Sequence, residues 1–206
     1  MAATSEQIVS FIKLLGNLAL NECNARIQRG EGFVVPSVCI AQSAHETGWG
    51  TSSLMTKANA FFGIKAGGSW TGKVFVADTW EVADGVAYNT VANFRAYDSL
   101  ADSVADYYNL IVNNSRYAAA ISTWPDKIVP AYDALYAIWA GGYATDELYV
   151  PHVWNLLQGR DLTQWDAKID GVTINPDAGN GGGYDYTPPT VSDSSSHVKF
   201  HFVKIE

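Results

Sequence analysis

A single carboxylic acid near the end of an apolar segment is the first candidate for chemistry in this sequence. The segment VPSVCIAQSAHETGWG spans residues 35–50 and carries Glu46 as its one carboxylate. Burial disfavours the charged form of a carboxylic acid, so such a group can hold its proton near neutral pH and donate it. A helix-terminal Glu that faces water is the alternative interpretation, and this segment alone does not decide between the two.

An acid of this kind suits the cleavage of a glycosidic bond. That reaction needs a proton donor for the leaving oxygen, and usually a second group that activates water or stabilises the cation-like transition state. Glu81 is a candidate for the second group because it lies on a predicted β-hairpin, 35 residues further on. A solvent-facing strand residue is the alternative. Tyr143, directly after Gly141-Gly142, either projects into a cleft from a loop or packs.

Composition and charge exclude several classes of protein. A net charge of −8 argues against a nucleic-acid binder, which normally shows a basic patch. The four His stand apart and no metal-binding motif occurs, so we predict neither a metal nor a cofactor. No apolar stretch is long enough to span a membrane. The two cysteines, Cys23 and Cys39, are predicted to be buried free thiols.

Apolar spacing and turn residues predict a mainly helical chain with a small β-lobe. Pro36 fits the first turn of a helix that Gly48 and Gly50 end. Lys73 to Arg95 alternates like two strands around an Asp84-Gly85 turn, a strong hairpin signal. Further helices are predicted over residues 5–26 with Ser5 as cap, 52–57, 98–113 from Asp98 or Ser99, 117–121, 127–139 and 147–157.

The composition divides the chain into a domain and a tail. Residues 1–170 carry the helices and a β-lobe at about 66–96, which we expect to form one catalytic domain. Residues 171–196 are a Gly/Pro/Ser-rich linker that cannot build a core. Residues 197–206 alternate like one strand, and a lone strand is unstable. We therefore expect this strand to pair with a partner or to lead into another module.

Five motifs in order resemble glycoside hydrolase family 73, the glucosaminidases of flagellar and autolysin type that cut peptidoglycan. They are AQSAHETGWGTSSL (41–54), ANAFFGIK (58–65), FRAYDSLADSVADY (94–107), RYAAA (116–120) and GGYATDELY (141–149). The resemblance covers roughly Ser5 to Asp166. It implies an α+β, mainly α, lysozyme-like fold, in which a helical lobe and a small β-hairpin lobe flank a glycan cleft. It also implies cleavage of the β-1,4 bond between N-acetylglucosamine and N-acetylmuramic acid.

The resemblance assigns roles residue by residue. Glu46 matches the family's catalytic acid, Glu81 its second acid in a variable stretch, and Tyr143 its active-site tyrosine. Four further motif residues are implied to contact the glycan: Phe62, Trp49, Asn59 and Tyr117. Trp49 packing under the catalytic helix is an equal alternative. The chain departs from the pattern at His45, where a small or apolar residue is usual, and at Glu147, where proline is common.

The sequence allows more than one interpretation of the catalytic mechanism and of the class of protein. Glu46 and Glu81 could act as an inverting pair, or the substrate's own acetamido oxygen could attack while Glu81 or Tyr143 assists. A lytic transglycosylase or muramidase on the same fold is the alternative enzyme, and a wall-binding module without activity is the alternative class. The N-terminus lacks signal-peptide features, so we expect a phage-released or virion-associated protein that acts on the bacterial wall. The C-terminal segment is then the expected attachment to a wall-binding module or to virion proteins.

Overall fold

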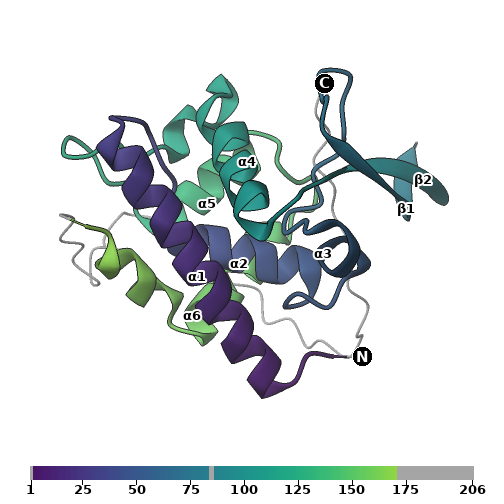
Figure 1. Ribbon diagram of the computed structural model, residues 1–206, viewed down its shortest axis with the longest axis horizontal. Helices are drawn as coiled ribbons and strands as arrows, with labels where there is room; N and C mark the ends of the chain where they lie inside the picture. Colours follow the sequence, from purple (N-terminus) through teal and green to yellow (C-terminus); the bar gives the residue numbers. More distant parts are fainter. Residues whose placement is uncertain (1, 84–85, 171–206) are drawn as a thin grey trace.

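A computed structural model describes residues 2–83 and 86–170, with the backbone alone for 79–83 and 86–89. Helix α2 (Pro36–Thr47) lies in the middle of the helical body and contacts α1 (Ser5–Gln28), α5 (Ala131–Ala140), α6 (Tyr149–Gly159) and the 3-10 helix η2 (Leu162–Lys168) (Figure 1). Every residue of α2 except His45 is buried. The central position of α2 follows from its composition, because a helix that is apolar on most of its surface must be covered on all sides.

Both ends of α2 are defined by specific residues. Pro36 occupies the first turn, and the side chain of Asp166 from η2 accepts hydrogen bonds from the N–H and the Oγ of Ser37, at 2.7 and 2.6 Å. At the other end Gly48 adopts a left-handed conformation, with φ 56°, and its N–H donates to the carbonyl of Ala44. A left-handed glycine is a common way to end a helix, so Glu46 lies two residues before the stop.

The other helical elements complete the body around α2. They are α3 (Ser53–Ala58), α4 (Leu100–Val112) and the 3-10 helix η1 (Ser115–Ala120). Helix α4 begins with a capping box in which Ser99 and Asp102 exchange hydrogen bonds. One apolar core joins α1, α2, α4, α5 and α6, and it includes both cysteines, which are buried and free as predicted.

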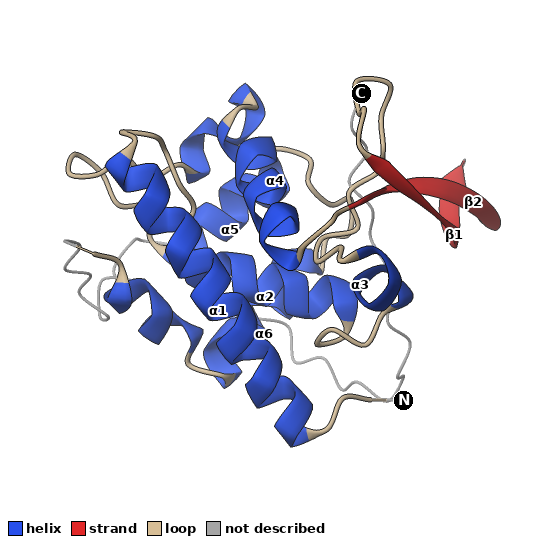
Figure 2. Cartoon of the chain, viewed as in Figure 1, coloured by secondary structure: helices blue, strands red, loops and turns tan. Residues whose placement is uncertain are grey.

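The β-lobe is one antiparallel hairpin that projects from the helical body beside α3 (Figure 2). Strands β1 (Lys73–Ala83) and β2 (Val86–Ala96) pair in continuous register, from Lys73 opposite Ala96 to Ala83 opposite Val86. Its base packs on a second small core of Leu54, Ala58, Ala60, Phe94 and Tyr97. The predicted Asp84-Gly85 turn lies outside the described residues.

The predicted architecture is confirmed, with corrections at several element boundaries. Thr4, not Ser5, caps α1, because the Thr4 hydroxyl accepts the N–H of Gln7. The helix predicted from residue 127 begins at Ala131, because Lys127 instead pairs with Thr123 in a β-bridge. The segment after residue 115 is a 3-10 helix, and η2 had no prediction.

Among the described residues, no helix is both long and apolar enough to cross a membrane. Nowhere in the described part of the chain do three or more His, Cys, Asp or Glu residues gather in a way that could hold a metal ion. The division into a domain, a linker and a terminal strand stays a prediction, because residues 171–206 lie outside the described part.

Candidate active site

The end of α2 turns sharply through three left-handed residues. Gly48, Trp49 and Gly50 have φ values of 56°, 63° and 82°. Trp49 is notable because a side chain with a Cβ rarely adopts a positive φ. Its ring packs edge-on against Phe11 at 5.9 Å and lies 5.7 Å from the guanidinium carbon of Arg160. These contacts hold the turn, and contact of Trp49 with glycan stays a prediction.

Glu46 is a buried carboxylic acid at the end of this helix. Its exposed fraction is 4%, and the hydroxyl of Tyr149 donates a hydrogen bond to its Oε1 at 3.3 Å. Burial raises the pKa of Glu46 from 4.5 to about 8, and the hydrogen bond from Tyr149 opposes this rise. Glu46 is therefore mostly protonated at neutral pH, which is the state a proton donor requires.

Tyr143 lies close to this acid and has an unusual environment. It follows Gly142, a left-handed residue with φ 87°, in the turn after α5. Its ring lies 6.0 Å from that of Tyr149, and the charge of Glu46 contributes to raising the Tyr143 pKa, behind burial and Tyr149. The Tyr143 hydroxyl is buried and has no hydrogen-bond partner among the described residues. A buried hydroxyl without a partner is costly, so a ligand group is a reasonable partner for it.

Glu81 lies on the hairpin, as predicted, at a position in β1 opposite Tyr88. Its side chain lies outside the described part of the structure. The structure therefore brings Tyr143, but not Glu81, into a described relation with Glu46. The role of Glu81 stays a prediction from the family motif.

The predicted glycan-contacting residues have clear structural contacts. Phe62 is buried and its ring stacks on Tyr107 at 4.1 Å. Asn59 ends α3 with φ 51° and donates to the carbonyls of Tyr97 and Asp98, which fixes α3 to the end of β2. These interactions within the protein are sufficient to account for both residues, so their contact with glycan stays a prediction.

Tyr117 is buried in η1 under the guanidinium of Arg116, whose central carbon lies 4.9 Å from the ring centroid. Its ring also touches the backbone of Gly141, where a Cβ would lie only 2.6 Å from Tyr117 Cδ1. Because Gly141 begins the turn that presents Tyr143, Tyr117 supports the position of that tyrosine. Direct contact of Tyr117 with a substrate stays a prediction.

The sequence analysis did not identify three polar residues, Gln42, Tyr107 and Tyr149, whose hydrogen bonds lead to Glu46. The buried side chain of Gln42 donates to the Tyr149 hydroxyl at 2.9 Å and accepts from the Tyr107 hydroxyl at 2.5 Å. One signal was available: Gln42 is a polar residue in an apolar helix and stands four residues before Glu46, on the same face. Nothing in the local sequence identifies its partners, which are 65 and 107 positions away.

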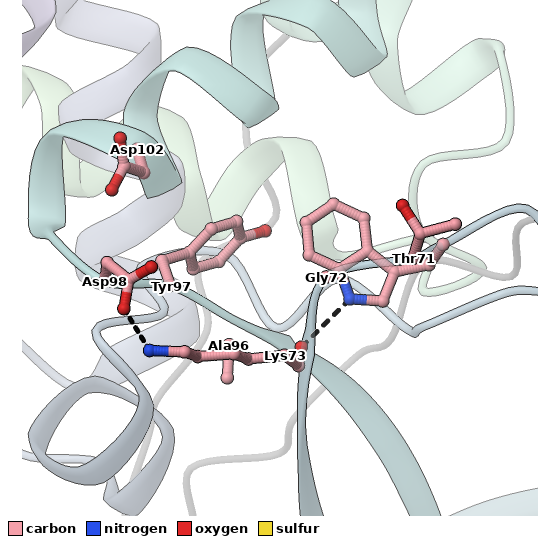
Figure 3. Close-up of a pocket in the computed structure, with 8 residues that line it drawn as sticks. Thr71, Gly72, Lys73, Ala96, Tyr97, Asp98 and Asp102 are labelled. Carbon is pink, nitrogen blue, oxygen red and sulfur yellow. Dashed lines mark hydrogen bonds and ion pairs between the residues drawn. The ribbon is translucent and has the colours of Figure 1, made fainter.

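A pocket of about 500 Å³ lies at the base of the hairpin, between β1 and the start of α4 (Figure 3). Its lining includes the aromatic side chains of Trp70 and Tyr97. Two other lining residues, Lys73 and Asp98, form an ion pair. The guanidinium carbon of Arg95, a residue of β2, lies 4.6 Å from the centre of the Trp70 ring. Glu46 does not line this pocket, so it is separate from the buried acid.

Comparison with known proteins gives a consistent result. The Glucosaminidase family model, described as mannosyl-glycoprotein endo-beta-N-acetylglucosaminidase, matches residues 25–162. The peptidoglycan hydrolase FlgJ of Escherichia coli K12 is 32% identical over 138 residues, which are 65% of this chain and 42% of that protein. The exo-glucosaminidase LytG of Bacillus subtilis is 32% identical over 148 residues, or 69% of this chain and 50% of that protein. The chain thus spans about half the length of these relatives or less.

Solved structures agree with the sequence matches. The catalytic domain of the autolysin Auto from Listeria monocytogenes superimposes with a TM-score of 0.64 and 32% identity, and the match covers 80% of this chain and 90% of that one. The match therefore covers most of this chain and nearly all of that catalytic domain.

Proposed function

Because the chain belongs to the Glucosaminidase family, glycoside hydrolase family 73, with its lysozyme-like fold, we propose that it hydrolyses the glycan strands of bacterial peptidoglycan. The bond we assign is the β-1,4 linkage between N-acetylglucosamine and N-acetylmuramic acid. The activities named for FlgJ and LytG support this substrate class. One observation carries the proposal: a buried acid at the end of the central helix, with its pKa raised to about 8.

In the proposed reaction Glu46 is the general acid. It holds a proton at neutral pH because burial penalises its charged form. As the glycosidic bond breaks, Glu46 transfers this proton to the leaving oxygen, which leaves as a hydroxyl instead of an alkoxide. The hydrogen bond from Tyr149 then stabilises the carboxylate that remains. The site thus favours the protonated state before the reaction and supports the ionised state after it.

A second group must assist the reaction at the anomeric carbon, and the two candidates, Glu81 and Tyr143, would do so in different ways. Glu81 would activate a water molecule and invert the anomeric carbon, from a lobe on the far side of the cleft. Tyr143 would assist a reaction in which the substrate's acetamido oxygen attacks. The hydroxyl of Tyr143, which lacks a partner among the described residues, supports a contact with substrate in either case. Phe62, Trp49, Asn59 and Tyr117 are proposed to line or support the cleft.

The test is digestion of purified peptidoglycan by the wild type, Glu46→Gln, Glu81→Gln and Tyr143→Phe, with the product ends identified by mass spectrometry. Glu147→Gln is the matched control, because Glu147 is an exposed carboxylate between Tyr143 and Tyr149. We expect reducing-end N-acetylglucosamine from the wild type and from the control, and its loss in Glu46→Gln.

Other outcomes select other functions. Anhydro or reducing N-acetylmuramic acid ends would indicate a lytic transglycosylase or a muramidase. No cleavage by the wild type, with retained binding to the wall, would indicate a binding module. Full activity in Glu81→Gln together with loss in Tyr143→Phe would favour the substrate-assisted reaction.

We also propose that residues 1–170 form the catalytic domain and that residues 171–206 attach it to a wall-binding module or to virion proteins. The Gly/Pro/Ser-rich composition of residues 171–196 and the alternating pattern after them support this. A phage-released or virion-associated enzyme follows as the proposed setting. Glucosaminidase activity in purified virions would support attachment, activity only in lysates would support release, and production by uninfected cells in the absence of a prophage would contradict both.

A further inference from the structure

A continuous line of hydrogen bonds leads from the core of the molecule to Glu46. It begins at Tyr107 in α4, passes through Gln42 in α2 and Tyr149 in α6, and ends at Glu46 Oε1. The three distances are 2.5, 2.9 and 3.3 Å. Tyr107, Gln42 and Tyr149 are each 0% exposed, so water does not compete for these bonds. We call these three residues the relay.

The direction of every bond in the relay is determined by Gln42. An amide side chain accepts through its oxygen and donates through its nitrogen, whereas a tyrosine hydroxyl has one proton to donate. Tyr107 donates to Gln42 Oε1, and Gln42 Nε2 donates to the oxygen of Tyr149. The single proton of Tyr149 is then left for Glu46.

The opposite orientation of the amide is less favourable. If the nitrogen of Gln42 faced Tyr107, the Tyr107 hydroxyl would accept, and its own proton would lose the acceptor that Gln42 Oε1 provides. Leaving a buried donor without a partner costs about 1–3 kcal/mol. The orientation in the structure gives each tyrosine hydroxyl and one N–H of Gln42 an acceptor, and it directs these donors toward the acid.

This orientation makes the two oxygens of Glu46 different. Oε1 accepts the hydrogen bond from Tyr149, so it is the oxygen that carries negative charge most easily. The proton of the neutral acid is therefore carried by Oε2. A proton on a defined oxygen can be aimed at a leaving group, whereas a carboxyl group that rotates between two states cannot.

We propose that Gln42 and Tyr107 are positioning residues for catalysis, which act through Tyr149 by orienting its hydroxyl toward Glu46 and so set which oxygen of that acid delivers the proton. The inference rests on the proposed function, because it assumes that Glu46 is the general acid. It also predicts a change in the titration of Glu46 that can be measured without an assay of enzyme activity. Loss of the relay removes a donor that stabilises the carboxylate, so the acid should ionise at a higher pH.

Other titratable groups lie near Glu46 or near its partner Tyr149 and must be kept constant in a test. Tyr143 approaches from the turn after α5, and Tyr149 from α6. The neighbouring His45 lies edge-on to the Tyr149 ring at 5.3 Å and against the ring of His152 at 6.1 Å. Substitutions at Gln42 and Tyr107 leave all four of these groups in place, so a shift in the titration of Glu46 is attributable to the relay.

The experiment measures the pH dependence of kcat/KM on peptidoglycan for the wild type, Gln42→Met, Tyr107→Phe and Tyr149→Phe. The alkaline limb reports the loss of the proton from the acid of the free enzyme. We expect this limb to move upward by about one pH unit in Tyr149→Phe, since a hydrogen bond to a charged group is worth a factor of ten or more. Gln42→Met should move it in the same direction, and Tyr107→Phe should move it least.

Tyr108→Phe is the matched control. Tyr108 is the next residue of α4, is equally buried, and its hydroxyl contacts Cys23 Sγ at 3.2 Å instead of the relay. Its alkaline limb should coincide with that of the wild type. A limb that stays unchanged in Gln42→Met, or one that moves as much in Tyr108→Phe as in Tyr107→Phe, would overturn the proposal.

A second measurement keeps the inference testable without activity. The carboxyl carbon of Glu46, assigned by its absence in Glu46→Gln, can be titrated by ¹³C NMR in the wild type and in each variant. An upward shift in Gln42→Met and Tyr107→Phe supports the relay even if the wall substrate is wrong, and coincident titrations refute it. Loss of cleavage in Glu46→Gln tests the proposed function separately. If Gln42→Met does not fold, the milder Tyr107→Phe against Tyr108→Phe decides.

Discussion

Replacing Glu46 by Gln should stabilise the folded protein, and the gain should grow as the pH rises. The pKa of Glu46 is about 8 in the fold and 4.5 when the group is unperturbed. Between these values the folded state binds more protons than the unfolded state, so stability falls with increasing pH. For these two pKa values the linkage relation gives a loss of about 1 kcal/mol at pH 5 and about 3 kcal/mol at pH 7.

Glutamine removes this titration but keeps the shape of the side chain and an oxygen that can accept from Tyr149. The stability advantage of Glu46→Gln over the wild type should therefore increase by about 2 kcal/mol from pH 5 to pH 7. Urea unfolding at pH 5, 6 and 7 measures it directly. Asp166, whose pKa is raised to about 7 by burial, is present in both proteins, so its contribution cancels.

The control is Glu147→Gln, which removes an exposed carboxylate from a chain of net charge −8. It reports the general effect of one less negative charge. If the advantage of Glu46→Gln is the same at pH 5 and pH 7, or no larger than that of Glu147→Gln, then Glu46 is not held in its protonated form. The reasoning that assigns it as the proton donor would then be refuted.

Three further predictions concern the residues around this acid. Tyr143→Phe should lower cleavage of peptidoglycan at least tenfold without lowering the unfolding free energy, because the hydroxyl has no partner among the described residues; an equal loss of stability would indicate a packing role. Asp166→Ala should reduce stability by about 2–3 kcal/mol in urea unfolding, because it removes the acceptor of two buried hydrogen bonds at the start of α2; a change below about 0.5 kcal/mol would contradict this. Gly141→Ala should lower both stability and activity, since its Cβ would lie 2.6 Å from the Tyr117 ring, whereas Gly159→Ala, with nothing within 4 Å, should change neither by much; similar effects of the two would exclude the steric explanation.

The features that the sequence predicted well are those with a local cause. Pro36 and Gly48 mark the ends of α2 because of their own backbone properties, and both act as predicted. The alternating residues on either side of Asp84-Gly85 are typical of a hairpin, and the two strands are confirmed. Glu46 stood out because a lone carboxylate in an apolar segment is a local conflict, and its burial is a fact of the structure.

The features that were missed depend on contacts between distant parts of the chain. Tyr149 reaches Glu46 from 103 residues away, and no local pattern states that α6 packs beside α2. The start of the helix predicted from residue 127 failed for a similar reason, because pairing of Lys127 with Thr123 overrides helix propensity there. Local propensity is a weak guide wherever tertiary pairing offers backbone groups another partner.

Glu46, Tyr143 and Trp49 each show a feature that is unfavourable for stability. A buried acid with a raised pKa and a buried hydroxyl without a partner each lower stability, and the two occur side by side. A backbone at positive φ in Trp49 adds a third unfavourable feature three residues beyond the acid. One such feature can result from packing, but three within one turn and its neighbour are typical of a functional site, where unfavourable features are retained because the reaction needs them. The proposed relay fits the same argument, because it lowers the cost of a charged Glu46 without supplying a full counter-charge. An arginine in place of Tyr149 would hold the acid ionised and prevent the proton donation that we propose.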